Sequence, residues 1–123
     1  MNSFRLLASL AVFLASPVSA YAETTCTASE KLQCLSGSGC QAVEPTIVVR
    51  LNPNLGTYSR CDAKGCDDYQ AQYSSSGMFI NIALPERGLL AKMAVDGSYF
   101  TEVATLATAV LVTFGSCKIG PTQ

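Results

Sequence analysis

The fold is decided by residues 78–105, which read MFINIALPERGLLAKMAVDGSYFTEVAT. Near the start of this stretch Ile80, Ile82 and Leu84 recur with a period of two, which is typical of a strand with one buried face. The next residues, Pro-Glu-Arg-Gly at positions 85–88, favour a turn. The stretch therefore begins with a strand that ends in a tight connection.

Two further apolar runs, residues 89–95 and 98–105, are joined by Asp96-Gly97, a dipeptide typical of short β-hairpins. Residues 89–95 are rich in Leu, Ala, Lys and Met, which also favour a short helix. The glycine before this run and the Asp-Gly pair after it favour a strand. We therefore expect a hairpin here.

The alternation of short β-type runs and turn signals continues on both sides of this stretch. About seven strands at roughly even spacing, with only tight connections between them, are typical of an antiparallel meander. The sequence also allows an eighth strand between Cys26 and Cys40. The sequence predicts an all-β fold, a small antiparallel meander barrel of about seven or eight strands, stapled by disulfides. Besides residues 78–84 and the hairpin, the expected strands are residues 46–51, 56–60, 68–73 and 109–114, and the serines and glycine of residues 74–77 are expected in a turn.

The N-terminus has the three parts of a secretory signal peptide. Met1–Arg5 give a short positive start, an apolar run follows, and small residues mark cleavage after Ala22, with Ala20 as the second choice. The apolar run is too short to remain as a membrane-spanning helix, and no cysteine directly follows either cleavage point. We expect a cleaved leader, residues 1–22, and one exported, soluble domain, residues 23–123, that is not a lipoprotein.

All six cysteines fall within that domain, and an even number in a small exported protein predicts a disulfide framework. Only Cys61 and Cys66 are paired by the sequence, because Asp-Ala-Lys-Gly between them predicts a turn that brings both within bridging distance. A zinc half-site is disfavoured by the spacing and by the absence of histidine. The sequence leaves open the pairing of Cys26, Cys34, Cys40 and Cys117.

Composition excludes several classes of function. Without Arg5 the chain has seven Lys and Arg against nine Asp and Glu, a net charge of −2, and no basic run, so nucleic acid is not an expected partner. No segment after the leader is long and apolar enough to enter a membrane. With no histidine, neither a histidine-dependent nucleophile nor a histidine metal centre can be built. We expect a binding protein, not an enzyme, with no cofactor and no metal.

One segment resembles a known family. Ser74-Ser75-Ser76-Gly77-Met78-Phe79, followed by a strand and then by Arg87-Gly88, is similar to the signature of bacterial inhibitors of c-type lysozyme, in membrane-bound and periplasmic forms. That signature reads Ser-x-Ser-Gly-x-x-aromatic, a strand, then a basic residue and glycine. The tryptophan that usually precedes the basic residue has no counterpart here. The resemblance implies an eight-stranded antiparallel barrel and a periplasmic location.

The resemblance also implies a mechanism of host defence evasion, in which two loops enter the cleft where lysozyme holds two carboxylic acids. The Ser76 hydroxyl would bind one acid and Arg87 the other, with both loops at one rim of the barrel. Gly77 and Gly88 would allow close approach, and Met78 would line an apolar rim.

Other interpretations remain open. Each of these residues also has a purely structural explanation, as a hairpin turn or as a solvated surface group. The barrel could instead be a carrier that holds a small ligand, or an envelope interaction module with no enzyme target. The sequence does not decide the oligomeric state.

Overall fold

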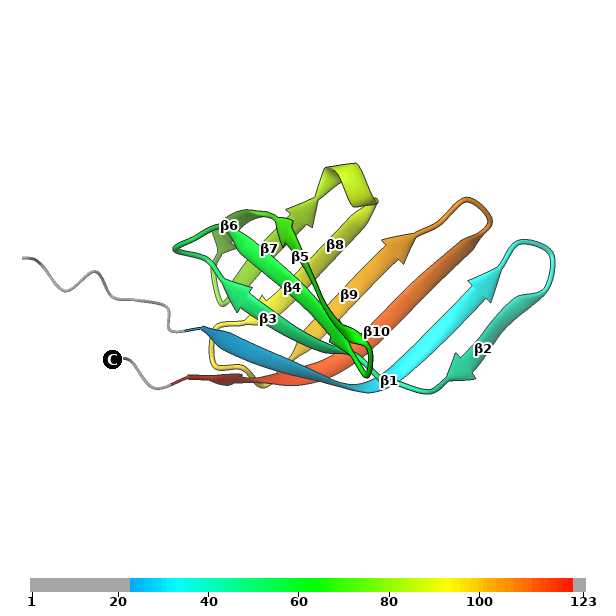
Figure 1. Ribbon diagram of the computed structural model, residues 1–123, viewed down its shortest axis with the longest axis horizontal. Helices are drawn as coiled ribbons and strands as arrows, with labels where there is room; N and C mark the ends of the chain where they lie inside the picture. The colour runs from blue at the N-terminus through cyan, green and yellow to red at the C-terminus, as the bar shows by residue number, and fades with distance from the viewer. Residues whose placement is uncertain (1–22, 121–123) are drawn as a thin grey trace, which may run out of the picture.

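The computed structural model describes residues 23–120, so the expected leader and cleavage points lie outside the described residues. The described chain is almost entirely β, with one 3-10 turn, η1 (Pro85–Arg87), and no helix long enough to cross a membrane (Figure 1). The strands are β1 (Thr24–Leu35), β2 (Gly39–Val43), β3 (Val48–Asn52), β4 (Thr57–Asp62), β5 (Gly65–Gln70), β6 (Gln72–Ser76), β7 (Phe79–Leu84), β8 (Leu89–Ala94), β9 (Phe100–Thr105) and β10 (Ala109–Ile119).

All strand pairs are antiparallel, in the order β5-β4-β3-β1-β10-β9-β8-β7-β6, with β2 also paired to β1. The two ends of this order, β5 and β6, are separated in sequence only by Ala71, whose N–H donates to the Gly56 carbonyl at 2.8 Å. Across the same junction the Tyr73 hydroxyl donates to the Thr57 carbonyl. One bent stretch of chain thus nearly closes the sheet, and the predicted small antiparallel barrel is confirmed.

The number of strands is higher than predicted, because two segments were assigned differently. The region from Cys26 to Cys40, where one strand was left open, forms the long strand β1 and part of β2. The expected strand at residues 68–73 divides into β5 and β6 at Ala71. Ser74 to Ser76, expected in a turn, continue β6, since an exposed edge strand accepts serine without a hydrophobic pattern. Residues 89–94 form the strand β8, as expected.

The barrel interior is filled by side chains. The period-two pattern of residues 80–84 holds, because Ile80, Ile82 and Leu84 are all buried. The largest fully buried side chains include Tyr58, Phe100, Leu51, Ile82 and Met93. Because these side chains occupy the interior, a carrier with its ligand inside the barrel is not favoured.

Three disulfides each join residues directly opposite one another in neighbouring strands. Cys61–Cys66 is the predicted pair, and the other two are Cys26–Cys117 and Cys34–Cys40. The six cysteines form no other arrangement, since none of them is free. Cys26–Cys117 joins the first strand to the last.

The β8–β9 loop is held against that disulfide. Gly97 has a φ of +79°, and the Cys117 N–H donates to its carbonyl at 2.7 Å. A Cβ at position 97 would lie 2.4 Å from the Cys117 carbonyl oxygen. The Asp-Gly pair therefore serves a close approach between this loop and β10, in a connection longer than a two-residue hairpin turn.

Candidate functional site

The two loops expected at one rim lie at opposite ends of β7. Ser76, Gly77 and Met78 precede this strand, whereas Arg87 and Gly88 follow it. A six-residue strand is about 20 Å long. Consecutive connections of an antiparallel meander always lie at opposite ends of the strand between them, so the expectation of a shared rim is wrong.

Arg87 and Gly88 are both exposed, and each also contacts a residue of another strand. The Arg87 guanidinium carbon lies 4.9 Å from the centre of the Tyr69 ring. Gly88 has a φ of +59°, and a Cβ there would lie 2.5 Å from Thr105 Oγ1. Its carbonyl accepts hydrogen bonds from the Thr105 N–H at 2.9 Å and from Thr105 Oγ1 at 3.0 Å. Gly88 therefore allows η1 to pack against the end of β9, a structural role that differs from partner contact.

The β6–β7 turn is also open to approach. Gly77 has a φ of +60°, and no atom lies within 4 Å of the place where its Cβ would be. Ser76 is exposed, and Met78 is 71% exposed. The Val95 N–H donates to the Met78 carbonyl at 2.9 Å, which ties the turn to the β8–β9 loop. The turn is thus both accessible and held in place.

A cavity of about 470 Å³ lies beside this turn, between Met78 and Phe79 on one side and Val95 and Tyr99 on the other. All four of these apolar or aromatic side chains are exposed. We call the set the turn surface: Ser76, Gly77, Met78, Phe79, Val95 and Tyr99.

Charged groups border the turn surface. The Lys92 ammonium lies 4.9 Å from the centre of the Phe79 ring, a cation–π contact. Hydrogen bonds from the Ser98 hydroxyl, at 2.6 Å, and from its N–H, at 2.9 Å, lower the pKa of Asp96. Asp96 therefore presents a carboxylate at the edge of the cavity.

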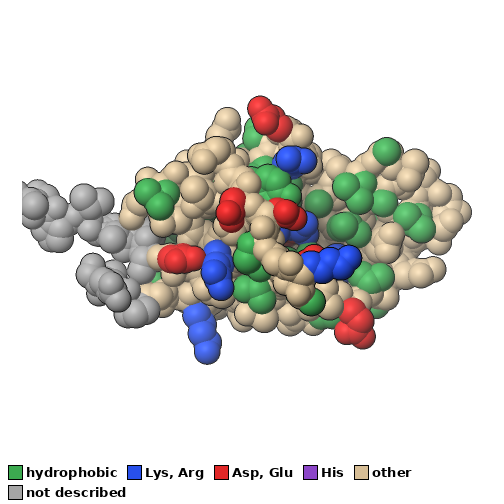
Figure 2. Space-filling view, viewed as in Figure 1, with side chains coloured by type: hydrophobic (Ala, Val, Ile, Leu, Met, Phe, Trp, Pro, Cys, Tyr) green, Lys and Arg blue, Asp and Glu red, His purple; other side chains and the backbone are tan. Residues whose placement is uncertain are grey.

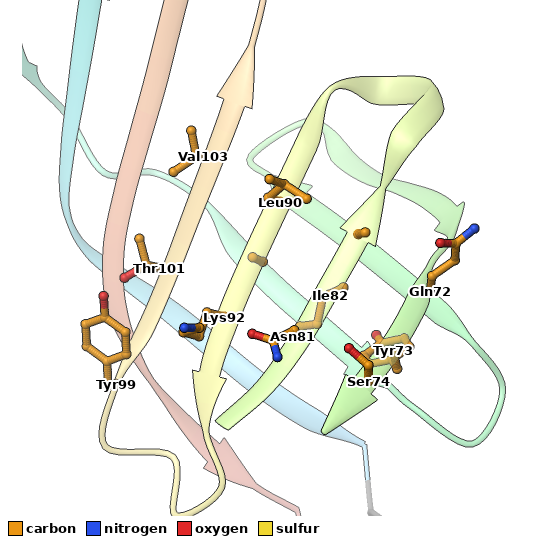
Figure 3. Close-up of a pocket in the computed structure, with 12 residues that line it drawn as sticks. Gln72, Tyr73, Ser74, Asn81, Ile82, Leu90, Lys92, Tyr99, Thr101 and Val103 are labelled. Carbon is orange, nitrogen blue, oxygen red and sulfur yellow. The ribbon is translucent and has the colours of Figure 1, made fainter. Parts of the chain in front are cut away.

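A second hollow continues from the turn surface across the outer face of β6 to β9, sharing Lys92 and Tyr99 with the first (Figure 3). Its volume is about 540 Å³. Leu90 and Val103 give it an apolar end, while Asn81 gives it an amide. The turn surface and this groove together form a continuous semi-apolar surface on one side of the barrel.

A buried charged network lies inside the barrel. Glu102, only 1% exposed, accepts a hydrogen bond from the Tyr58 hydroxyl and two from Arg60, at 3.1 Å from Nε and 2.9 Å from Nη2. Burial, and next the charge of Glu102, raise the pKa of Tyr58 far above its ordinary value. Arg60 is held through two of its nitrogens, so this network fixes the packing of β4 against β9. The Tyr58 and Glu102 side chains are withdrawn from solvent, while the Arg60 side chain keeps 24% exposure.

Within residues 23–120, no three His, Cys, Asp or Glu side chains are close enough together to hold a metal ion. Sequence reasoning included Met78 among the site residues but missed Val95 and Tyr99. Their exposure depends on the β8–β9 loop lying beside the β6–β7 turn, a pairing that no local pattern reveals. Comparison with known protein families, with curated proteins and with solved structures gave no match to this chain.

Proposed function

We propose that the protein is a non-catalytic, periplasmic binding module that contacts another protein through the turn surface. The observation that carries this proposal is the accessible Ser76-Gly77 turn beside a cluster of exposed Met78, Phe79 and Tyr99 side chains. Exposed aromatic residues and methionine around a hollow are the composition found in protein interfaces. Strands on both sides hold these residues in place, so little conformational entropy is lost on binding.

More narrowly, we propose that the partner is c-type lysozyme and that binding inhibits it. This choice of partner rests on the resemblance of residues 74–88 to the signature of the lysozyme inhibitors. In this binding mode the Ser76 hydroxyl donates a hydrogen bond to a carboxylic acid of the lysozyme cleft. Gly77 allows close approach of the two backbones, and Met78 packs against the apolar wall of the cleft.

The proposed contact leaves out Arg87, which lies beyond the other end of β7. It therefore differs from a two-loop insertion in a way that can be measured. The net charge of −2 outside the leader suits a basic partner but is too small to steer association strongly.

The experiment measures how fast c-type lysozyme clears a bacterial suspension in the presence of the purified, oxidised protein. We expect slowed lysis, a loss of about tenfold or more in inhibition for Ser76→Ala because a hydrogen bond to a charged acid is lost, and a further loss for Met78→Ala. Arg87→Ala is the matched control at the opposite loop, and its inhibition should equal that of the parent protein. Circular dichroism confirms that each variant is folded.

Two results would contradict the narrower proposal. Unchanged lysis at roughly 50 µM protein, well above the Kd of a specific complex, would exclude lysozyme as the partner. An equal loss of inhibition in Arg87→Ala and Ser76→Ala would exclude binding through one end of the barrel.

An envelope interaction module that uses the same surface is the second candidate, favoured by the groove that extends the turn surface over β6 to β9. A photo-crosslinking amino acid placed at position 78 or at position 87 tests it in living cells. Adducts from position 78 and none from position 87 are expected. The reverse pattern would reject the turn surface as the contact.

A further inference from the structure

β2 is an edge strand, paired with β1 on one side and with no other strand of residues 23–120. It runs along the outer edge of the part of the sheet formed by β1, β9 and β10 (Figure 1). Exposed edge strands usually carry charges or proline, which prevent pairing with other chains. β2 reads Gly-Cys-Gln-Ala-Val and carries neither. Its free edge is therefore open to the addition of another strand.

The Cys34–Cys40 disulfide shows which backbone groups of β2 are free. The Cα atoms of this opposed pair are 3.9 Å apart, the close spacing of a pair that is not hydrogen-bonded. Because the two kinds of pair alternate along an antiparallel ladder, Gln41 points its N–H and C=O toward β1. Cys40 and Ala42 point theirs toward the free edge, so four backbone groups lie there without a strand to bind.

We propose that this edge pairs antiparallel with β2 of a second copy of the chain, about a twofold axis at Gln41. In this register Cys40 lies opposite Ala42 of the second copy, and Ala42 lies opposite Cys40 of the second copy. Each of the two opposed pairs exchanges two hydrogen bonds, so four hydrogen bonds use all the free backbone groups of Cys40 and Ala42 on both copies. The interface is isologous and closes at a dimer.

The side chains fit a second copy on both faces of the extended sheet. On one face, Leu32 and Ala42 lie in line with the Cys34–Cys40 disulfide of the other copy and form an apolar row with it. On the other face Gln33 and Gln41 meet the same two glutamines across the axis. A glutamine amide both donates and accepts hydrogen bonds, so identical side chains can pair.

The absence of charged residues around β2 also favours a second copy of the chain as the partner. Residues 32–43 and 103–117 contain no Asp, Glu, Lys or Arg, so two copies meet here without like charges. Figure 2 shows the right-hand end of the molecule as hydrophobic and uncharged side chains, with one acidic group below it and the other charged groups over the barrel. A different edge strand, β5, carries Asp67 and Asp68, which would repel their counterparts in a second copy.

The β1–β2 hairpin is ordered before association. The disulfide staples it, and the Ser36 N–H donates to the Thr108 carbonyl of the neighbouring β9–β10 hairpin at 3.0 Å. A pre-ordered strand loses little entropy on pairing. A five-residue strand pair is still a small interface, so we expect a weak dimer in the micromolar to millimolar range.

The test is sedimentation equilibrium of the oxidised protein from about 10 µM to about 1 mM. We expect a monomer–dimer equilibrium for the parent protein. Gln41→Glu and Gln41→Lys each place two like charges at the axis, and each should weaken the dimer by about tenfold or more. A one-to-one mixture of the two variants should recover the dimer. Gln72→Glu and Gln72→Lys, at an exposed glutamine of β6, are matched controls that should leave association unchanged.

Each possible result decides the proposal. A monomer at every concentration overturns it, and the free edge is then left to an extended peptide from another protein. A dimer that is equally stable in the position-41 and position-72 variants places the interface elsewhere. Failure of the one-to-one mixture to recover association would reject the twofold register.

Discussion

Replacing Arg60 with methionine removes the cation that holds Glu102 inside the barrel. Glu102 is 1% exposed, so water replaces the guanidinium poorly, and within the protein the carboxylate keeps only the hydrogen bond from the Tyr58 hydroxyl. Breaking a buried ion pair in this way costs about 3–5 kcal/mol of unfolding free energy. The Arg60 side chain retains 24% exposure, so we expect the lower value, about 3 kcal/mol. This is a large part of the 5–15 kcal/mol that stabilises a typical domain.

The assay is equilibrium unfolding in guanidinium chloride with the disulfides intact. The double variant Arg60→Met/Glu102→Gln should recover most of the loss, because a neutral amide no longer needs a cation. Arg50→Met is the matched control, since Arg50 is exposed on the neighbouring strand β3 and its loss should cost no more than about 0.5 kcal/mol. A loss below about 1 kcal/mol for Arg60→Met, or a double variant as unstable as the single, would refute the reasoning.

Two further predictions concern a backbone contact and a titration. Gly97→Ala should lower the unfolding free energy by about 2 kcal/mol or more, because the added Cβ would clash with the Cys117 carbonyl oxygen. Gly77→Ala is the control, with a similar positive φ but open space around it, and should cost only about 1 kcal/mol. Equal losses of the two variants in thermal unfolding would contradict this prediction. Burial raises the pKa of Tyr73 from 10.0 to about 12, so the folded state holds the phenol proton more tightly than the unfolded state does. The protonated Tyr73 hydroxyl therefore contributes stability that is complete below pH 10 and is lost as the pH rises to about 12. Unfolding free energy measured across that range should fall less steeply in Tyr73→Phe, and an unchanged slope would show that this group does not contribute.

The sequence predicted the fold class because the local signals agree with one another. Residues 80–84 alternate, and the loop that contains Asp96-Gly97 joins two strands in the structure. Cys61–Cys66 was predictable because the turn between the two cysteines is local. The pairing of Cys26 with Cys117 was not, since it depends on β1 lying beside β10 after a sequence separation of 91 residues.

The candidate site was predicted only in part, and topology explains why. Gly77 was correctly expected in a turn, because Ser-Gly is a turn signal, whereas Ser76 ends β6 and Met78, expected in the next strand, lies in the exposed turn. Arg87 was assigned to the same rim, although the intervening strand carries it to the other end. The ion pair between Arg60 and Glu102 forms only when the barrel closes, because closure brings β4 and β9 together although the two residues are 42 positions apart in sequence. Neither residue carries a local pattern that reveals its partner.

The order in which the chain is synthesised gives the Cys26–Cys117 bond a particular place in maturation. A ribosome makes Cys26 first among the six thiols and Cys117 last, so the earliest sulfur must wait for the latest. The two hairpin-spanning bonds can close soon after their own turns are made, which removes four competing sulfurs. Oxidation of the Cys26–Cys117 pair therefore requires both β1 and β10, and a product lacking β10 would leave Cys26 without its partner.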